Sequence, residues 1–181
     1  MGKQPFFMLN VKWLKPHVSM LLLRSIFFTL LMPGTVTILI PYWLASFRGQ
    51  LTLQANQVLR YVGLPPIVIG AVTLLWCIWR FYSDGRGSLA PVDPPKRLVV
   101  RGPYRYVRNP MYAGVLLILL GEAIYFLSWP ILAEAGMFLA VTHLFVRYYE
   151  EPVLRRKFGE SYERYLQTVG RWIPRHWHRA T

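Results

Sequence analysis

Two polar stretches of this 181-residue chain carry the side chains best suited to chemistry. The first runs from Lys96 to Tyr112 and interleaves arginines with tyrosines. Within it Gly102-Pro103 marks a turn, and Pro110 fits the first turn of a following helix without losing a hydrogen bond. The free N–H groups of such a helix start suit a carboxylate ligand. The alternative interpretation is a basic flank with an aromatic belt, as found beside many membrane spans.

The second stretch contains two adjacent carboxylates, Glu150 and Glu151, at the end of an apolar segment. Carboxylates at the end of a membrane helix are costly unless they are solvated or paired. Arg147 precedes them by three and four residues, a spacing that allows a local ion pair on a helix. Pro152 is expected to end the helix at Glu151 and to start the next one. A simple salt-bridge cluster at the membrane surface remains the alternative.

Other ionisable residues lie inside the apolar segments. His143 falls on the same helix face as Arg147 and the two carboxylates, at spacings of three or four residues. It is either a neighbour of the site or a partner in a hydrogen bond between helices. Glu134 follows Trp129-Pro130 closely, and we expect it to be solvated near the outer surface.

The composition combines 54% hydrophobic residues with a net charge of +13. The charges avoid the long apolar stretches and gather between them, as a bilayer requires of its proteins. A soluble nucleic-acid binder would spread such charge over its surface, so we expect no nucleic-acid partner. Cys77 is the only cysteine, which excludes an internal disulfide and an all-cysteine metal site. We expect no metal.

The apolar segments predict an all-α, multi-pass membrane protein with about four transmembrane helices, since each span needs ~20 mostly apolar residues. A fifth segment, 153–168, has one apolar face and is predicted to be an amphipathic helix along the membrane interface. The four predicted spans cover residues 18–44, 61–81, 111–127 and 129–146.

Lysines and arginines predict the topology. Four lie before the first span or within its first turns, through Arg24, seven from Arg80 to Arg108, and eight from Arg147 onward. With four spans these regions share one side, so both termini are predicted to be cytoplasmic.

The sequence predicts a single membrane domain that covers residues 1–181. Its parts are the first two spans in 1–82, a long cytoplasmic loop that binds the cofactor at 83–110, a helical hairpin at 111–147, and the Glu-Glu motif, interfacial helix and basic tail at 148–181.

Together the two stretches resemble the isoprenylcysteine carboxyl methyltransferase and phospholipid methyltransferase family of integral membrane enzymes, in a bacterial-type form. The resemblance covers roughly residues 85–175. It rests on an ordered set of motifs, which are Gly102-Pro103-Tyr104, Arg108-Asn109-Pro110-Met111-Tyr112, Glu150-Glu151, Leu154, Phe158-Gly159, Tyr162, Tyr165 and Ile173-Pro174.

The resemblance implies S-adenosylmethionine as the cofactor and the 83–110 loop as part of its site. Cofactor contacts are implied for Lys96, Arg97, Leu98, Val99, Tyr104, Arg108, Asn109, Pro110, Met111, Tyr112 and Glu150. Catalytic roles are implied for Glu150, Glu151 and Arg147, although the register of Arg147 is shifted by one. Asn109 stands where the carboxyl methyltransferases carry histidine, and an amide cannot titrate.

The residues themselves are compatible with that cofactor. An acidic side chain such as Glu150 can bind its ammonium or ribose hydroxyls, and tyrosine rings can face its sulfonium. The predicted function is therefore methyl transfer onto a lipid-like, prenylated or small hydrophobic acceptor, by O-, N- or S-methylation of a carboxylate, amine or thiol, at the cytoplasmic interface of a bacterial inner membrane. Membrane lipids are the expected partners, and the oligomeric state is not indicated. The alternatives are a reductase-like enzyme or a non-catalytic interaction protein on the same scaffold.

Overall fold

The computed structural model describes residues 33–47, 57–84 and 98–175, and within these ranges the chain is helical. The described residues contain no strand beyond one isolated β-bridge between Val107 and Gly170. The all-α prediction is therefore confirmed. Residues 18–32 of the first predicted span, Lys96, Arg97 and the rest of 85–97, and the tail 176–181 lie outside the described residues.

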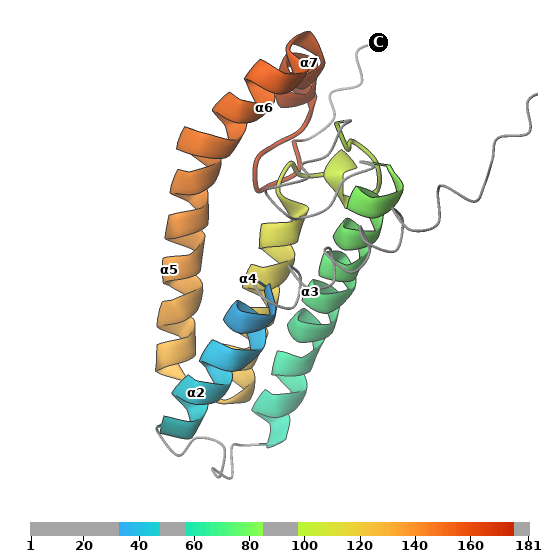
Figure 1. Cartoon of the computed structure of the whole chain (residues 1–181). Helices are drawn as coiled ribbons and strands as arrows, with labels where there is room; N and C mark the ends of the chain where they lie inside the picture. The colour runs from blue at the N-terminus through green and yellow to red at the C-terminus, as the bar shows by residue number, and fades with distance from the viewer. Residues whose placement is uncertain (1–32, 48–56, 85–97, 176–181) are drawn as a thin grey trace, which may run out of the picture.

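In this part of the chain the bundle is built on three long helices that run antiparallel, α3 (Gln57–Ser83), α4 (Pro110–Tyr125) and α5 (Trp129–Phe145) (Figure 1). A shorter helix, α2 (Ile40–Phe47), follows a π-helical turn at Thr35–Leu39 and packs against α5. Buried Leu74, Val115 and Leu119 form the core where α3 meets α4.

Glycines bring the backbones of α3 and α4 into contact. A Cβ atom built on Gly70 would lie 2.5 Å from the carbonyl oxygen of Gly114, and one on Gly63 would lie 2.7 Å from that of Gly121. Each helix thus carries two glycines seven residues apart, facing the two on its partner. Small residues at a helix contact let membrane helices approach closely, and van der Waals packing then contributes to their association.

A tight turn joins α4 to α5. Leu127 adopts a positive φ of 50°, and the Ser128 N–H donates to the Ala123 carbonyl at 2.9 Å. The Ser128 hydroxyl then accepts from the Ile131 N–H at 3.4 Å and caps α5. The two helices therefore form a hairpin with almost no connecting chain.

The expectation that Pro152 ends the helix is wrong. Helix α5 continues through a π-helical turn at Val146–Glu150 into α6 (Glu151–Phe158). Within that turn the Glu151 N–H bonds to the Val146 carbonyl, five residues back. A proline inside an α-helix clashes with the carbonyl four residues earlier, and a widened turn just before it relieves that clash.

The helix break lies instead at Gly159, whose φ of +51° favours glycine. It divides the predicted 153–168 helix into α6 and α7 (Glu160–Thr168). Tyr162 and Tyr165 of α7 are buried with Val169. A location of these helices along the membrane interface stays a prediction.

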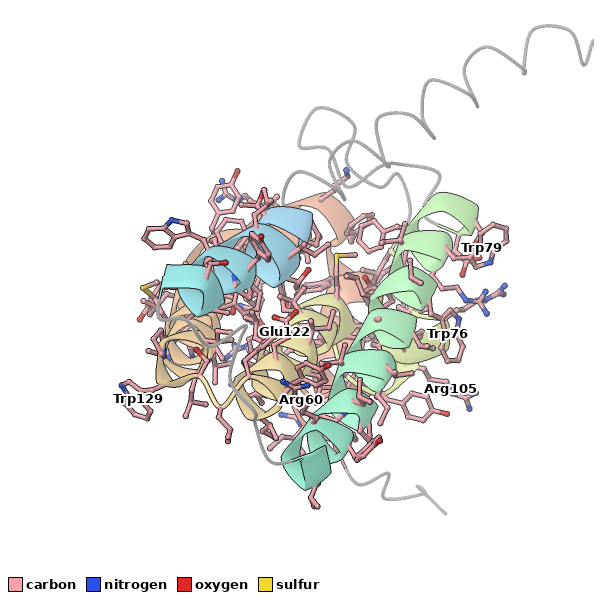
Figure 2. All side chains as sticks on the ribbon, turned by 90° about the horizontal axis from the view of Figure 1, so that it is seen from below. Arg60, Trp76, Trp79, Arg105, Glu122 and Trp129 are labelled. Carbon is pink, nitrogen blue, oxygen red and sulfur yellow. The ribbon has the colours of Figure 1, made fainter. Side chains whose placement is uncertain are left out.

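Two helical stretches are long and apolar enough to cross a membrane. They are Arg60–Phe81, with a mean hydropathy of 2.0, and Trp129–Phe158, with 1.5. Thr35–Ser46 and Pro110–Tyr125 are apolar but shorter. Large apolar side chains such as Trp79 and Trp129 point away from the bundle (Figure 2), at 62% and 72% exposure. The helices thus have the outward apolar surface of a membrane protein, and the number of four spans stays a prediction.

Glu134 contradicts the expectation of a solvated side chain, because it is only 7% exposed. It lies on α5 beside buried Ile131 and Ala135, on the side of the helix that packs into the bundle. Proximity to the helix start in the sequence says nothing about which side of the helix a residue occupies, and here the buried side holds the carboxylate.

The glycine contact makes a test of the packing. We expect Gly70→Ala to lower the free energy of unfolding by about 1–3 kcal/mol, because the added methyl group meets the Gly114 backbone. Gly136→Ala is the matched control, since its Cβ would have no atom within 4 Å and alanine is the better helix former. The measurement is the thermal midpoint in detergent by tryptophan fluorescence. Equal midpoints for the two variants would contradict the packing argument.

Candidate active site

The two polar stretches identified in the sequence meet at one end of the bundle. Residues 98–109 return across the end of α3, and the long helix of α5 and α6 brings Glu150 and Glu151 to the same end (Figure 1). A cavity of about 150 Å³ lies between them. Its walls come from α3, the 98–109 segment, the long helix and α7. The lining residues are Phe81, Leu98, Val99, Tyr104, Arg108, Asn109, Val146, Glu150, Glu151, Leu154, Phe158, Tyr162 and Tyr165.

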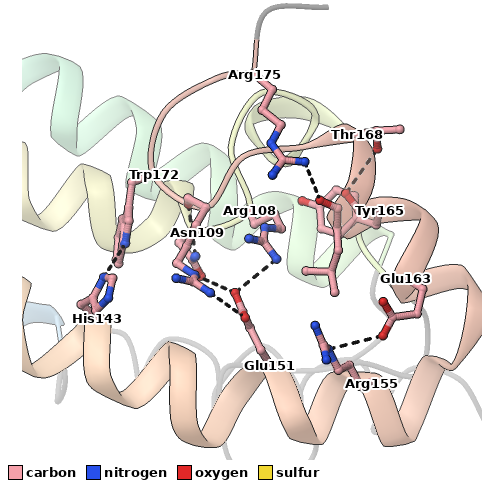
Figure 3. Close-up of polar contacts among 12 residues, drawn as sticks. Arg108, Asn109, His143, Glu151, Arg155, Glu163, Tyr165, Thr168, Trp172 and Arg175 are labelled. Atoms are coloured by element: carbon pink, nitrogen blue, oxygen red, sulfur yellow. Dashed lines mark hydrogen bonds and ion pairs between the residues drawn. The ribbon is translucent and has the colours of Figure 1, made fainter.

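Glu151 is held by two arginines from distant parts of the chain (Figure 3). Arg171 donates from Nε to Oε1 at 2.8 Å and from Nη2 to Oε2 at 2.9 Å, a two-point contact. Arg108 adds a third contact, Nη1 to Oε1, at 3.2 Å. The Glu151 side chain is 9% exposed, and both of its oxygens are engaged. Its carboxylate is therefore committed to holding the structure together.

Glu150 has a different environment. The Tyr112 hydroxyl of α4 donates to its Oε2 at 3.2 Å. Its carboxylate lines the cavity, and no ion pair with an arginine or lysine is seen for it among the described residues. Of the two adjacent acids, Glu150 is thus the one able to meet a cationic or hydroxyl group of a ligand.

The C-terminal segment 169–175, which we call the strap, is fastened to the 104–109 segment. The Arg108 N–H donates to the Gly170 carbonyl at 2.8 Å. The Asn109 side-chain amide donates to the Arg171 carbonyl at 3.2 Å. Asn109 therefore positions the strap that carries Arg171. The donor is an amide N–H, which does not ionise.

Tyrosines form the neutral wall of the cavity. The Tyr165 hydroxyl donates to the Tyr104 carbonyl at 2.6 Å, and the Tyr104 ring lies 5.6 Å from that of Phe81. Burial raises the pKa of Tyr104 and of Tyr165 well above the ordinary value, and it raises the pKa of Tyr162 to about 12. At neutral pH the phenols are protonated, so the wall is aromatic and uncharged.

Most of the residues proposed from the sequence lie in or beside the cavity. Leu98, Val99, Tyr104, Arg108, Asn109, Glu150 and Glu151 line it. Met111 packs against the Val99 and Tyr104 cluster, and Pro110 is buried at the first turn of α4. Tyr112 reaches the site through Glu150. Lys96 and Arg97 lie outside the described residues.

Arg147, a proposed catalytic residue, does not line the cavity. Its side chain is exposed, and its guanidinium lies 5.5 Å from the centre of the Tyr148 ring. The ion pair that its spacing allowed is made instead by Arg108 and Arg171. A catalytic role for Arg147 stays a prediction.

Sequence reasoning missed several lining residues and one partner. Leu154, Phe158, Tyr162 and Tyr165 belong to the apolar face of the predicted 153–168 helix, and in the structure they line the cavity. Their helical spacing indicated that they share one apolar face, but spacing does not show what packs against that face. Arg171 had no local signal. Only the need of a buried carboxylate for a partner pointed to it.

Residues 58–161 match the profile of the phospholipid methyltransferase family, so the chain belongs to that family. The chain is also similar to probable protein-S-isoprenylcysteine O-methyltransferases of Oryza sativa subsp. indica and Oryza sativa subsp. japonica. Each is 27% identical over 135 residues, which cover 74% of this chain and 63% of the relative. The match thus spans less than two thirds of the relatives' length. No solved structure matches the chain.

The arginine contacts of Glu151 can be tested by stability. Glu151→Gln keeps the shape of the side chain but leaves Arg108 and Arg171 without their counter-charge. We expect a loss of about 3–5 kcal/mol in unfolding free energy, as when one partner of a buried pair is removed. The measurement is the midpoint of denaturation in detergent.

Glu163→Gln is the matched control. Glu163 pairs with Arg155 at 3.3 Å, but both side chains are about half exposed, and such a surface pair contributes about 0–1 kcal/mol. If the two variants lose equal stability, Glu151 does not hold the site together.

Proposed function

We propose, on the premise that the chain belongs to the phospholipid methyltransferase family, that it is an S-adenosylmethionine-dependent methyltransferase. The acceptor is a lipid-like or small hydrophobic molecule met at the cytoplasmic surface of the membrane. The observation that carries the proposal is the position of Glu150. Its carboxylate faces a tyrosine-lined cavity while the neighbouring Glu151 is neutralised by two arginines.

The residues present fit the cofactor by their chemistry. Glu150 offers a carboxylate for an ammonium or for ribose hydroxyls, and charged hydrogen bonds of this kind are among the strong ones. The aromatic wall around Tyr104 suits an adenine ring or a sulfonium cation. The cavity of about 150 Å³ is smaller than the ~300–1,000 Å³ typical of small-molecule sites. We infer that binding of the whole cofactor widens it.

When bound, S-adenosylmethionine would supply an electrophilic methyl group to the acceptor, with its sulfur as the leaving group. The chain's contribution is positioning and exclusion of water, which can lower a barrier by several kcal/mol. Glu150 holds the cationic partner. Glu151 and Arg171 keep the strap closed at the edge of the cavity.

The need for a base depends on the acceptor. A carboxylate or thiolate requires none, whereas an amine must lose a proton. Glu151 is poorly suited to accept that proton because both of its oxygens are bound by arginines. Asn109 cannot titrate. Among the described cavity residues Glu150 remains the candidate base.

The placement in the membrane is part of the proposal. Segments 98–109 and 147–175, which carry many of the basic residues, lie at the same end of the bundle (Figure 1), and residues of both line the cavity. Basic residues favour the cytoplasmic side. This supports a site on the cytoplasmic side. We further propose that both termini lie on that side and that the chain sits in a bacterial inner membrane with lipids as its partners.

Cofactor binding tests the proposal directly. We expect the detergent-purified protein to bind S-adenosylmethionine in equilibrium titration, and Glu150→Gln to weaken binding by about 10–100-fold. That range corresponds to the ~1.5–3 kcal/mol of a hydrogen bond to a charged group. Glu163→Gln, on the outer side of α7, is the control and should bind as the original chain does.

Two results would overturn the proposal. No binding of the original chain at millimolar cofactor would favour a non-catalytic or reductase-like protein on this scaffold. Unchanged affinity in a folded Glu150→Gln variant would remove Glu150 from the site.

A further inference from the structure

The hydrogen bond that directs Glu150 depends on how the Tyr112 ring is held. Fixing a glutamate side chain costs conformational freedom. The Tyr112 hydroxyl offsets part of that cost, because it donates to Glu150 Oε2 at 3.2 Å. A carboxylate that is already held in the cavity loses less freedom when a ligand binds to it. Side chains that hold the Tyr112 ring therefore act on Glu150 without touching the ligand.

Two aromatic rings contact the Tyr112 ring. The ring centres of Phe138 on α5 and of Trp172 in the strap each lie 6.5 Å from the Tyr112 ring centre, with the planes tilted by 59° and 56°. Tilted pairs at such distances are a favourable arrangement of aromatic rings. Phe138 belongs to a helix of the bundle, whereas Trp172 belongs to a segment that is not helical. The strap therefore supplies one of the two rings that hold Tyr112.

Trp172 is itself held at two points. Its indole N–H donates to His143 Nδ1 at 3.1 Å, and the two ring planes lie within 22° of parallel (Figure 3). An indole nitrogen can only donate, so Nδ1 is the acceptor and the His143 ring proton sits on Nε2. On the backbone, Asn109 donates to the Arg171 carbonyl, which belongs to the peptide group that joins Arg171 to Trp172. The His143 bond thus joins α5 to the strap and not to another helix.

These contacts connect the two adjacent acids through the strap. Glu151 binds the Arg171 guanidinium at 2.8 and 2.9 Å. Trp172 follows Arg171 in the chain, and its ring contacts that of Tyr112. The Tyr112 hydroxyl completes the set by donating to Glu150. A displaced strap would therefore take away one of the rings beside Tyr112 and loosen its hold on Glu150.

We propose that Trp172, held by His143, is a positioning residue for Glu150: through Tyr112 it keeps the carboxylate directed into the cavity while the strap is fastened. This rests on the proposed function, in which Glu150 holds the cationic partner. Trp172 does not line the cavity, so it acts through Tyr112 and not by contact with a ligand there. Fastening of the strap is thereby coupled to the affinity for the cofactor.

A double-mutant cycle tests whether Trp172 acts through Tyr112. The measurement is equilibrium binding of S-adenosylmethionine to the full-length protein in detergent. We expect Tyr112→Phe, which keeps the ring but removes the donor, to weaken binding about tenfold, as loss of one hydrogen bond to a charged group would. Trp172→Leu should weaken it about three- to tenfold, because the donor is still present but its ring is less well held.

The double variant decides the outcome. It should bind the cofactor as Tyr112→Phe does, because residues that act through one another are not additive. Losses that multiply in the double variant would overturn the proposal, and so would unchanged binding in a folded Trp172→Leu. Trp129→Leu is the matched control. Trp129 is an exposed tryptophan at the start of α5, and its loss should leave binding as it is.

The hydrogen bond to His143 is tested by a conservative pair of variants. His143→Leu removes the acceptor of the Trp172 indole N–H, whereas the side-chain oxygen of His143→Gln can still accept it. We expect His143→Leu to weaken cofactor binding as much as Trp172→Leu does, and His143→Gln to bind as the original chain does. Equal losses in the two His143 variants would contradict the role given to this bond and overturn the proposal.

A measurement without cofactor separates this proposal from the one on which it rests. The protein is labelled with ¹³C at the glutamate carboxyl carbons, and the NMR resonance of Glu150 is assigned by its absence from Glu150→Gln. At neutral pH we expect Tyr112→Phe and Trp172→Leu to shift this resonance in the same direction, and Trp129→Leu to leave it in place. If Trp172→Leu does not fold, Trp172→Phe takes its place, since it keeps a ring but cannot donate to His143.

The two proposals can then fail independently. A shifted Glu150 resonance in a chain that binds no S-adenosylmethionine would support the positioning role and reject the methyltransferase. Cofactor binding by the original chain, with an unshifted Glu150 resonance in the Trp172 variant, would do the reverse.

Discussion

The contact of Glu151 with Arg108 and Arg171 is the constraint on which the site depends. Burying a carboxylate costs several kcal/mol unless it is paired with good geometry and its remaining lone pairs are satisfied. Here the partners come from the segment before α4 and from the strap after α7, 43 residues before and 20 residues after Glu151 in the sequence. Three separate parts of the chain are thereby joined at one carboxylate, and the cavity lies among them.

Two adjacent acids can serve different purposes because neighbouring residues on a helix do not face the same way. Glu151 points toward the arginines, while Glu150 points toward Tyr112 on α4. The π-helical turn that ends at Glu150 adds to this arrangement, since it carries the helix past Pro152 without a break. A helix ended at Glu151 would not have brought Leu154 and Phe158 to the cavity.

Patterns in the sequence predicted much of the fold. They did not predict the partners of Glu151 or all the residues that line the cavity, and the reasons are physical. Apolar runs predicted the helices, and the grouping of basic segments predicted that the two motifs share one end of the bundle. Spacing along a helix reports only local neighbours, so it allowed an ion pair of Arg147 with either carboxylate and gave no indication of Arg171. Spacing also indicates an apolar face without showing what packs against it, so it did not predict that the α7 tyrosines line the cavity.

Asn109 stands where the carboxyl methyltransferases carry histidine, and its contact with the strap suggests why asparagine suits this position. Its amide N–H holds the Arg171 carbonyl, so the position requires a hydrogen-bond donor and not a group that titrates. A histidine at the same place also carries a ring N–H that can donate a hydrogen bond. The described cavity then offers Glu150 alone as an acceptor of protons, with the tyrosines protonated and Glu151 occupied. For the proposed methyl transfer, such a cavity favours acceptors that arrive already deprotonated, such as a carboxylate or a thiolate.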